Sequence, residues 1–166
     1  YATEMAARWL EADGALGYVL NVGGNIRIVG TKPDGSGWNT GIRDPQDPDG
    51  SFAVSLDLSD TACVTSGTYE RYYMVDGEKY HHIIDKDTLY PADYFESLTV
   101  VTKDSGLADA LSTALFVMGL DAGAALYRAG DLAFDAVFMT DDGSVWITPG
   151  LAGQYQSDRP YQVLQP

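Results

Sequence analysis

The segment Ser105–Leu120 constrains the fold most, because it is a helix-length run whose only charge is Asp109. Its apolar side chains recur at helical spacing and predict one buried face, formed by Leu107, Ala110, Leu111, Ala114, Leu115 and Met118. The opposite face lacks the Lys and Glu residues of a solvated helix and holds Asp109, Ser112, Thr113 and Phe116. A helix with so little charge is expected to be buried on most sides.

Asp109 needs a physical explanation in that setting, because a buried, unpaired carboxylate is costly. Thr113 follows one turn later, so both side chains project from the same face. A carboxylate and a hydroxyl at this spacing can share a hard cation such as Mg²⁺. Two structural alternatives stay open and are favoured by spacing alone: Asp109 accepts the Thr113 hydroxyl, or it occupies the favourable first turn of the helix.

Composition limits the class of protein and of partner. A chain of 166 residues suits one domain with a real core. Its formal net charge of −14 argues against nucleic acid and anionic membrane surfaces as partners, and an anionic ligand would need amides, the few bases or a metal. Cys63 is the single cysteine, so no internal disulfide is possible, and its strand-like context predicts a packed small hydrophobe.

The remaining patterns predict an α/β (α+β) fold with a largely antiparallel sheet and at least three helices. Tyr1–Leu10 already lies inside an amphipathic helical pattern, so we expect a piece of a longer protein. A further helix is predicted at about Ala122–Ala129, and an irregular tail after Pro149. Alternation and turn residues predict strands at 17–22, 25–29, 38–43, 52–56, 61–65, 72–75, 79–84, 97–102, 134–139 and 144–148, with loops at 33–37 and 44–50.

Several other residues could carry chemistry. His81 and His82 are adjacent in a predicted strand, so they point to opposite faces and only one can line a pocket. Gly23–Gly24 could admit a phosphate close to the backbone, but a tight hairpin turn is the simpler explanation. Tyr69 could stack on a ring system or serve as a core aromatic.

Five segments in order resemble the C-terminal half of the ApbE-like flavin transferases, the FAD:protein FMN transferases, from Tyr1 to about Leu151. These segments are Asn21–Arg27, Trp38–Pro45, Thr65–Tyr72, His82–Asp85 and Ala108–Ala114. The resemblance implies a T-fold-like architecture, with residues 1–166 forming the C-terminal portion of a transferase domain whose upstream half is absent. That upstream half of the same protein would supply the remaining flavin contacts and metal ligands.

The resemblance also implies a reaction. FAD is bound with Mg²⁺, and FMN passes to a threonine hydroxyl of a target flavoprotein while AMP leaves. Asp109 and Thr113 match the metal ligands, with Ser112 adjacent, and His82 matches the base that activates the acceptor threonine. Ile83, Gly23, Gly24 and Tyr69 match cofactor-side positions, whereas His81 is expected to be structural.

Two departures from the family pattern stand out. Lys86-Asp87-Thr88-Leu89 replaces the usual Pro and Thr-Gly after His-Ile-Ile-Asp, and Thr68 stands where an acid is common. The resemblance further implies an exported parent in the cell envelope or periplasm, or on the extracellular face, anchored as a lipoprotein. It implies acceptors with a Ser/Thr-Gly-Ala-Thr type motif.

Two other functions remain as alternatives. One is hydrolysis of FAD to FMN and AMP, and the other is FAD binding without catalysis, or an inactive fragment. The isolated chain is expected to transfer little or no FMN, because the missing half would supply ligands.

Overall fold

The computed structural model describes residues 1–47 and 50–165. These residues form two α-helices, one short 3₁₀ helix and twelve strands. The helices are α1 (Ala2–Ala12), α2 (Ser105–Ala129) and the 3₁₀ helix η1 (Pro149–Leu151). The strands are β1 (Tyr18–Val22), β2 (Asn25–Val29), β3 (Trp38–Arg43), β4 (Phe52–Leu58), β5 (Thr61–Gly67), β6 (Tyr72–Val75), β7 (Glu78–His81), β8 (Phe95–Thr102), β9 (Asp135–Thr140), β10 (Val145–Ile147), β11 (Tyr155–Gln156) and β12 (Gln162–Val163).

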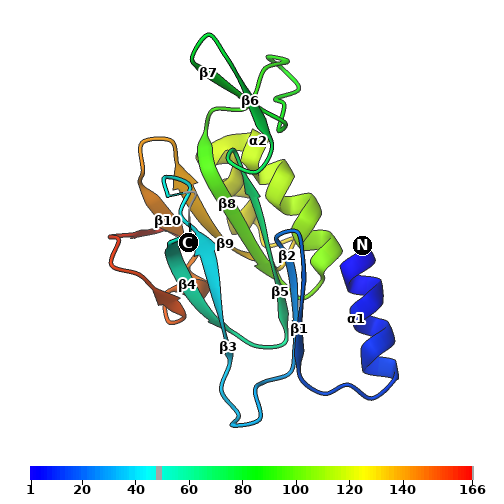
Figure 1. Cartoon of the computed structure of the whole chain (residues 1–166). Coiled ribbons are helices and arrows are strands. Elements are labelled where there is room, and N and C mark those ends of the chain that lie inside the picture. Colours follow the sequence, from blue (N-terminus) through cyan, green and yellow to red (C-terminus); the bar gives the residue numbers. More distant parts are fainter. Residues whose placement is uncertain (48–49, 166) are drawn as a thin grey trace.

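The architecture has three layers. A seven-stranded sheet, in the order β1-β2-β5-β8-β9-β10-β12, lies between helix α2 on one face and the three-stranded sheet β11-β4-β3 on the other (Figure 1). A separate two-stranded hairpin, β6–β7, projects beyond one end of the large sheet (Figure 1). Every strand pair within the described residues is antiparallel except β10 with β12, so the predicted largely antiparallel α/β fold is confirmed.

Strict alternation on the central strands explains why both faces of the large sheet are covered. On β5, Ala62 and Val64 point to helix α2, while Cys63 points to the small sheet. On β9, Phe138 packs under the helix and Val137 packs under the small sheet. Successive strand residues face opposite sides, so a strand buried on both faces must be apolar throughout. Burial raises the pKa of the Cys63 thiol to about 12, as expected for a packing residue.

Helix α2 has well-defined ends. Asp104 caps its first turn by accepting hydrogen bonds from the main-chain N–H groups of Gly106 (2.8 Å) and Leu107 (3.0 Å). Gly130 ends the helix in the left-handed conformation, and Gly119 interrupts it at φ +78°. By length and composition α2 could span a membrane. Its buried side chains form one of the two core clusters, however, which is how the central helix of a globular domain behaves.

The predicted buried face of this helix is wrong in part. Ala110, Ala114 and Met118 are exposed, whereas Ser112 and Phe116, expected on the opposite face, are 1% and 0% exposed. The helix is therefore rotated about its axis relative to the prediction. The reason is packing, because the large Phe116 ring fits against Phe95 with a centroid distance of 5.7 Å.

Two other local predictions need correction, and a third is confirmed. The strand predicted at 79–84 ends at His81, because the chain turns there to leave the hairpin. The tail after Pro149 is ordered, since β11 pairs with β4 and β12 pairs with β10. The helix predicted near Ala122–Ala129 is present, since Gly119 has non-helical angles (φ +78°, ψ +171°) and the kink there separates this stretch of α2 from the helix that begins at Ser105. Within the predicted loop 44–50, residues 48–49 lie outside the described residues.

Gly30 makes a close approach that can be tested. It has φ +62°, and a Cβ there would lie 2.2 Å from the main-chain oxygen of Leu16. We expect Gly30→Ala to lower the free energy of unfolding by about 1–2 kcal/mol for the left-handed backbone, and by about 1–3 kcal/mol more for the clash. Gly35→Ala is the matched control, because Gly35 has φ +82° with open space around it. Equal losses for both variants in urea unfolding would contradict the clash.

Candidate functional site

Asp109 lies on the exposed side of α2, so the expectation that it is buried is wrong. The helix begins at Ser105 with Asp104 as its cap, which places Asp109 beyond the first turn. The Thr113 hydroxyl donates to the main-chain oxygen of Asp109 at 3.5 Å and leaves the carboxylate alone. Neither structural alternative therefore uses the carboxylate, and no hydrogen bond or ion pair to it occurs among the described residues.

Hydroxyl groups gather beside Asp109. Ser66, at the end of β5, donates to the Ser112 hydroxyl at 2.9 Å and lies 3.5 Å from that of Thr113. Ser112 also donates to the main-chain oxygen of Asp109 at 3.0 Å. Sequence reasoning missed Ser66 as a member of this group. The period of two along β5 could have found it, since Ser66 shares the helix-facing side with Ala62 and Val64.

The Gly23–Gly24 pair forms the turn between β1 and β2, so the simpler explanation is confirmed for its backbone. Both glycines have positive φ angles, +58° and +85°, as a tight two-residue hairpin requires. The main-chain oxygen of Gly24 accepts from the N–H of Thr65 at 3.4 Å, which places the turn next to Ser66. A Cβ at Gly23 would meet nothing within 4 Å, so the space outside the turn is open. A role toward a cofactor stays a prediction.

The oxygen groups around Asp109 suit a hard cation. Mg²⁺ prefers oxygen ligands and is commonly held by one or two carboxylates together with substrate phosphates and water. Asp109 and Thr113, with Ser112 and Ser66 beside them, offer one free carboxylate and several hydroxyls. No group of three His, Cys, Asp or Glu side chains suited to a metal occurs in residues 1–47 and 50–165. The chain would therefore supply only part of a coordination sphere.

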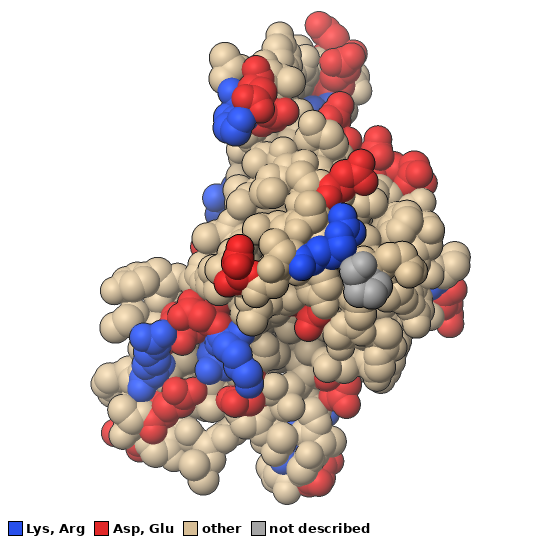
Figure 2. Space-filling view, turned by 180° about the vertical axis from the view of Figure 1, so that it is seen from behind, with Lys and Arg blue, Asp and Glu red and all other residues tan. Residues whose placement is uncertain are grey.

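Few basic side chains are available to bind a phosphate. Seven of the ten Lys and Arg residues form ion pairs with acids: Arg8, Arg27, Arg43, Lys79, Lys86, Lys103 and Arg159. On the face seen in Figure 2, most of the blue groups lie beside red ones. Arg71 is exposed and has no ion pair within the described part of the chain. A metal would therefore do much of the charge neutralisation for an anionic ligand.

His82 follows the end of β7 and is exposed. Its main-chain N–H and its ring Nδ1–H both donate to the main-chain oxygen of Arg71, at 3.2 and 3.3 Å. A carbonyl oxygen only accepts, so this bond places a proton on Nδ1, and in the neutral ring the lone pair then lies on Nε2. His82 is thus held in the tautomer that can accept a proton from a hydroxyl group.

His81 has the opposite character, as predicted. It is 7% exposed, its Nε2–H donates to the main-chain oxygen of Ala92 at 3.0 Å, and its Nδ1 accepts from the N–H of Ile83 at 3.3 Å. Ile83 is 4% exposed and belongs to the core, and its main-chain oxygen accepts from Ala92 at 3.0 Å. A contact between Ile83 and a cofactor stays a prediction.

Burial lowers the pKa of His81, although its bond to the Ala92 carbonyl opposes the shift. The folded protein therefore favours neutral His81, and the unfolded chain binds more protons at mildly acidic pH. We expect this contribution to stability to be complete above the ordinary pKa of 6.5 and to be lost as the pH falls through the lowered value. Thermal unfolding from pH 7.5 to 5 should show the loss. The loss should shrink in His81→Gln and persist in His82→Gln.

The end of β7 and the oxygen groups near Asp109 both contact helix α2. The Phe116 ring packs edge-on against His81 with a centroid distance of 5.9 Å, and Phe116 lies one turn beyond Ser112. Phe116 is three residues after Thr113, which is about 4.5 Å along a helix axis. The end of β7, which directly precedes His82, and the oxygen groups at Thr113 are therefore packed against neighbouring turns of α2.

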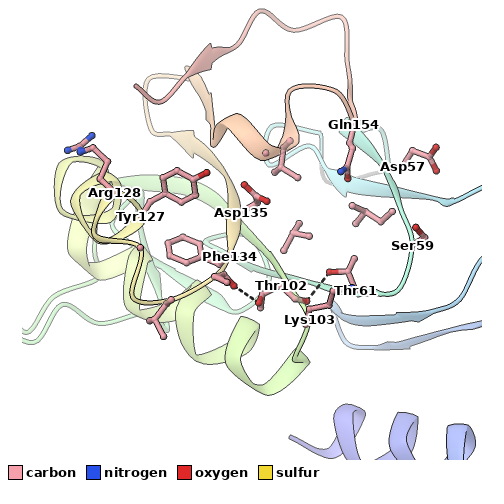
Figure 3. Close-up of a pocket in the computed structure, with 17 residues that line it drawn as sticks. Asp57, Ser59, Thr61, Thr102, Lys103, Tyr127, Arg128, Phe134, Asp135 and Gln154 are labelled. Carbon is pink, nitrogen blue, oxygen red and sulfur yellow. Dashed lines mark hydrogen bonds between the residues drawn. The ribbon is translucent and has the colours of Figure 1, made fainter. Parts of the chain in front are cut away.

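A groove of about 700 Å³ lies at the other end of the large sheet and does not include the predicted site residues. Figure 3 shows Asp135 facing it, with Tyr127, Phe134 and Gln154 along its walls. Its threonines are already bonded: Thr61 donates to the main-chain oxygen of Thr102, and Thr102 donates to that of Ala133. Asp135 accepts from Thr148 at 2.6 Å. These polar groups serve the fold.

Comparison with known proteins identifies the family. The model of the ApbE family matches residues 1–138. The chain belongs to the ApbE family. It is 35% identical over 144 residues to an FAD:protein FMN transferase of Vibrio cholerae, covering 86% of this chain and 43% of that protein. It is 37% identical over 142 residues to one of Treponema pallidum, covering 80% and 39%.

Solved ApbE structures share the fold. The ApbE protein of Thermotoga maritima superposes with a TM-score of 0.77 at 35% identity, covering 87% of this chain and 47% of that one. The flavin transferase ApbE of V. cholerae gives 0.72 at 30%, covering 92% and 48%. The predicted ApbE-like fold is therefore confirmed. The chain spans about half the length of the relatives that it matches.

Two departures from the ApbE pattern now have a structural description. The Thr68 hydroxyl donates to Glu96 of β8 at 3.0 Å, so an acid lies beside the position where the resemblance led us to expect one. Leu89 adopts φ +61°, a conformation that favours glycine. Tyr69 is half-buried against Gly67, where a Cβ would lie 2.6 Å from its ring. Its role in stacking on a cofactor stays a prediction.

Proposed function

We propose that the protein containing this chain is an FAD:protein FMN transferase that moves FMN from FAD to a threonine hydroxyl of a target flavoprotein and releases AMP. The observation that carries the proposal is His82, whose Nε2 is left free by the bond from Nδ1 to the Arg71 carbonyl. Membership of the ApbE family and the unpaired Asp109 carboxylate support it. The half of the relatives that this chain does not match would complete the FAD site.

His82 would act as the general base. Its Nε2 would take the proton of the acceptor hydroxyl as the oxygen attacks the phosphorus of the FMN phosphate. The bond from that phosphorus to the bridging oxygen breaks, and AMP leaves with the electron pair. Asp109 and Thr113 would hold Mg²⁺, which when bound supplies charge neutralisation at the pyrophosphate. In a chain whose basic side chains are mostly paired with acids, that neutralisation has few other sources.

Hydrolysis of FAD to FMN and AMP is the second candidate. The specific observation in its favour is the exposure of His82, because water can reach the same Nε2 as a threonine hydroxyl. The two reactions differ in the fate of FMN. Transfer leaves FMN covalently attached to the acceptor, whereas hydrolysis releases it into solution.

The proposal is tested by replacing the carboxylate. In the native protein that contains this chain, with the acceptor protein present, we expect Asp109→Asn to lower Mg²⁺-dependent AMP release from FAD by about 10²-fold or more, because the variant loses the only charged ligand in the cluster. Asp121→Asn is the matched control, since Asp121 is exposed on the same helix. Chromatography of FAD, FMN and AMP gives the rate, and equal rates for both variants would refute the assignment of Asp109.

The place of action is also a proposal. From the family resemblance, we infer a parent protein in the cell envelope or periplasm, or on the extracellular face, anchored as a lipoprotein. The isolated 166-residue chain is expected to show little or no transfer. Robust transfer by the isolated chain would contradict the requirement for the upstream half.

A further inference from the structure

A second groove, of about 540 Å³, opens beside His82. It lies between the β6–β7 hairpin and the loop that follows β7, which project together beyond the end of the large sheet (Figure 1). We call it the hairpin groove. Apart from His81 and His82 its lining is Arg71, Tyr72, Tyr73, Tyr80, Ile84, Leu89, Tyr90 and Pro91.

The walls of the hairpin groove are aromatic and exposed. Tyr73 and Tyr80 stack across the hairpin with a centroid distance of 5.6 Å and an interplanar angle of 10°. Tyr73 and Tyr90 are each 64% exposed, and Ile84 is 48% exposed. Contiguous exposed apolar surface of this kind marks interaction sites, and tyrosine is enriched in them.

Leu89 is held exposed at the hairpin groove in a backbone conformation that costs free energy. It is 76% exposed and adopts φ +61°, which a branched side chain rarely takes. The loop holds it there: Leu89 N–H donates to the main-chain oxygen of Asp85, and Asp85 N–H donates to that of Tyr90, both at 2.8 Å. Glycine would relieve the backbone strain. Packing within the described chain does not account for a leucine at this position.

We infer that the hairpin groove docks the acceptor protein, with Leu89 and Tyr90 binding an apolar side chain next to the acceptor threonine. The inference rests on the proposed function. His82 lines the groove, and the hydroxyl that it deprotonates must come within hydrogen-bond distance of Nε2. An extended segment rises about 3.3 Å per residue, so the residues that flank this threonine must cross the groove walls. Leu89 is thus a specificity-determining residue for the acceptor.

The test uses two labelled peptides and the native protein without FAD. Both contain Ser-Gly-Ala-Thr, one with leucines on each side and one with serines. We expect the leucine-flanked peptide to bind at least 10-fold more tightly in fluorescence anisotropy. Leu89→Gly should remove most of this difference while leaving thermal stability unchanged or higher, because glycine relieves the positive φ. Leu16→Ala, a change of an 87% exposed leucine outside the groove, is the control.

The outcomes are distinct. Equal binding of the two peptides, no binding of either, or wild-type behaviour of Leu89→Gly would overturn the inference. Protection of Tyr90 from nitration in the native protein without peptide would also overturn it, by showing that the protein's own chain fills the groove. AMP release from FAD is measured separately with the leucine-flanked peptide as the acceptor. If this peptide binds preferentially but the native protein with Mg²⁺ and FAD neither releases AMP nor labels the peptide, the proposed function is refuted and the groove stands. If FMN is transferred but the two peptides bind equally, the inference about the groove is overturned and the proposed function stands.

Discussion

His82→Ala is expected to lower FMN transfer to the acceptor by about 10²–10⁴-fold in the native protein, the usual contribution of a positioned general base. The side chain is exposed and outside the core, so the variant should keep its fold. FAD binding should also persist, because the Asp109 cluster is unaffected. Transfer is measured under single-turnover conditions, by the flavin fluorescence of the acceptor protein after gel electrophoresis. These conditions separate the chemical step from binding.

If His82 is the general base, a small base added to the solution should replace it in part, which would not happen if its role were structural. Added imidazole should restore part of the transfer rate in His82→Ala, with a rate that rises with the fraction of neutral imidazole. Asp76→Asn is a suitable control, since Asp76 lies at the hairpin tip with φ +50°, a conformation that asparagine tolerates. An unchanged transfer rate in His82→Ala would exclude His82 as the base.

The strands were predictable from sequence because their pattern is local. Alternation in 61–65 and 134–139 matches β5 and β9, whose two faces pack against different layers. The turn residues Asp76-Gly77 and Asp142-Gly143 lie where the predicted hairpins turn. In these segments the chemistry of neighbouring residues decides the structure, and no distant partner is needed.

The predictions that failed concern segments whose structure is set by contacts with residues far away in the sequence. Ala110, Ala114 and Ser112 are all small, so their spacing did not distinguish the buried face of α2, and the fit of Phe116 against Phe95 set the rotation. β11 and β12 contain two residues each and exist because β4 and β10 offer free edges. The short polar sequence of the tail carries no periodicity that could reveal such pairings.

In the candidate site, too, some features could be predicted from the sequence and others could not. The residue types at Asp109, Thr113 and His82 were available from the sequence, but the tautomer of His82 depends on the Arg71 carbonyl, eleven residues earlier. The partnership of Ser66 with Ser112 joins positions separated by 46 residues. Chemical roles can be proposed from motifs, whereas the state that makes a group reactive comes from contacts that only the fold creates.

A buried ion cluster that sequence reasoning did not anticipate fixes the start of α2. Glu4 of α1 is 8% exposed, accepts from the N–H of Ser105 at 3.0 Å, and lies 3.6 Å from the guanidinium of Arg27. Arg27 on β2 is also 8% exposed and lies 3.5 Å from Glu11. Glu4 therefore joins α1 and β2 to the first residue of the helix that carries Asp109.

Glu4→Ala is expected to lower the free energy of unfolding by about 3–5 kcal/mol, because it leaves Arg27 buried without its buried acidic partner and removes the acceptor for the Ser105 N–H. Glu11→Ala is the matched control, since Glu11 pairs with the same guanidinium but its side chain is 38% exposed, and a loss of about 0–1 kcal/mol is expected. Urea unfolding measures both. If the two losses were equal, the cluster would not anchor α1. If Glu4→Ala also weakens Mg²⁺ binding while Glu11→Ala does not, the position of the Asp109 carboxylate depends on how α2 begins.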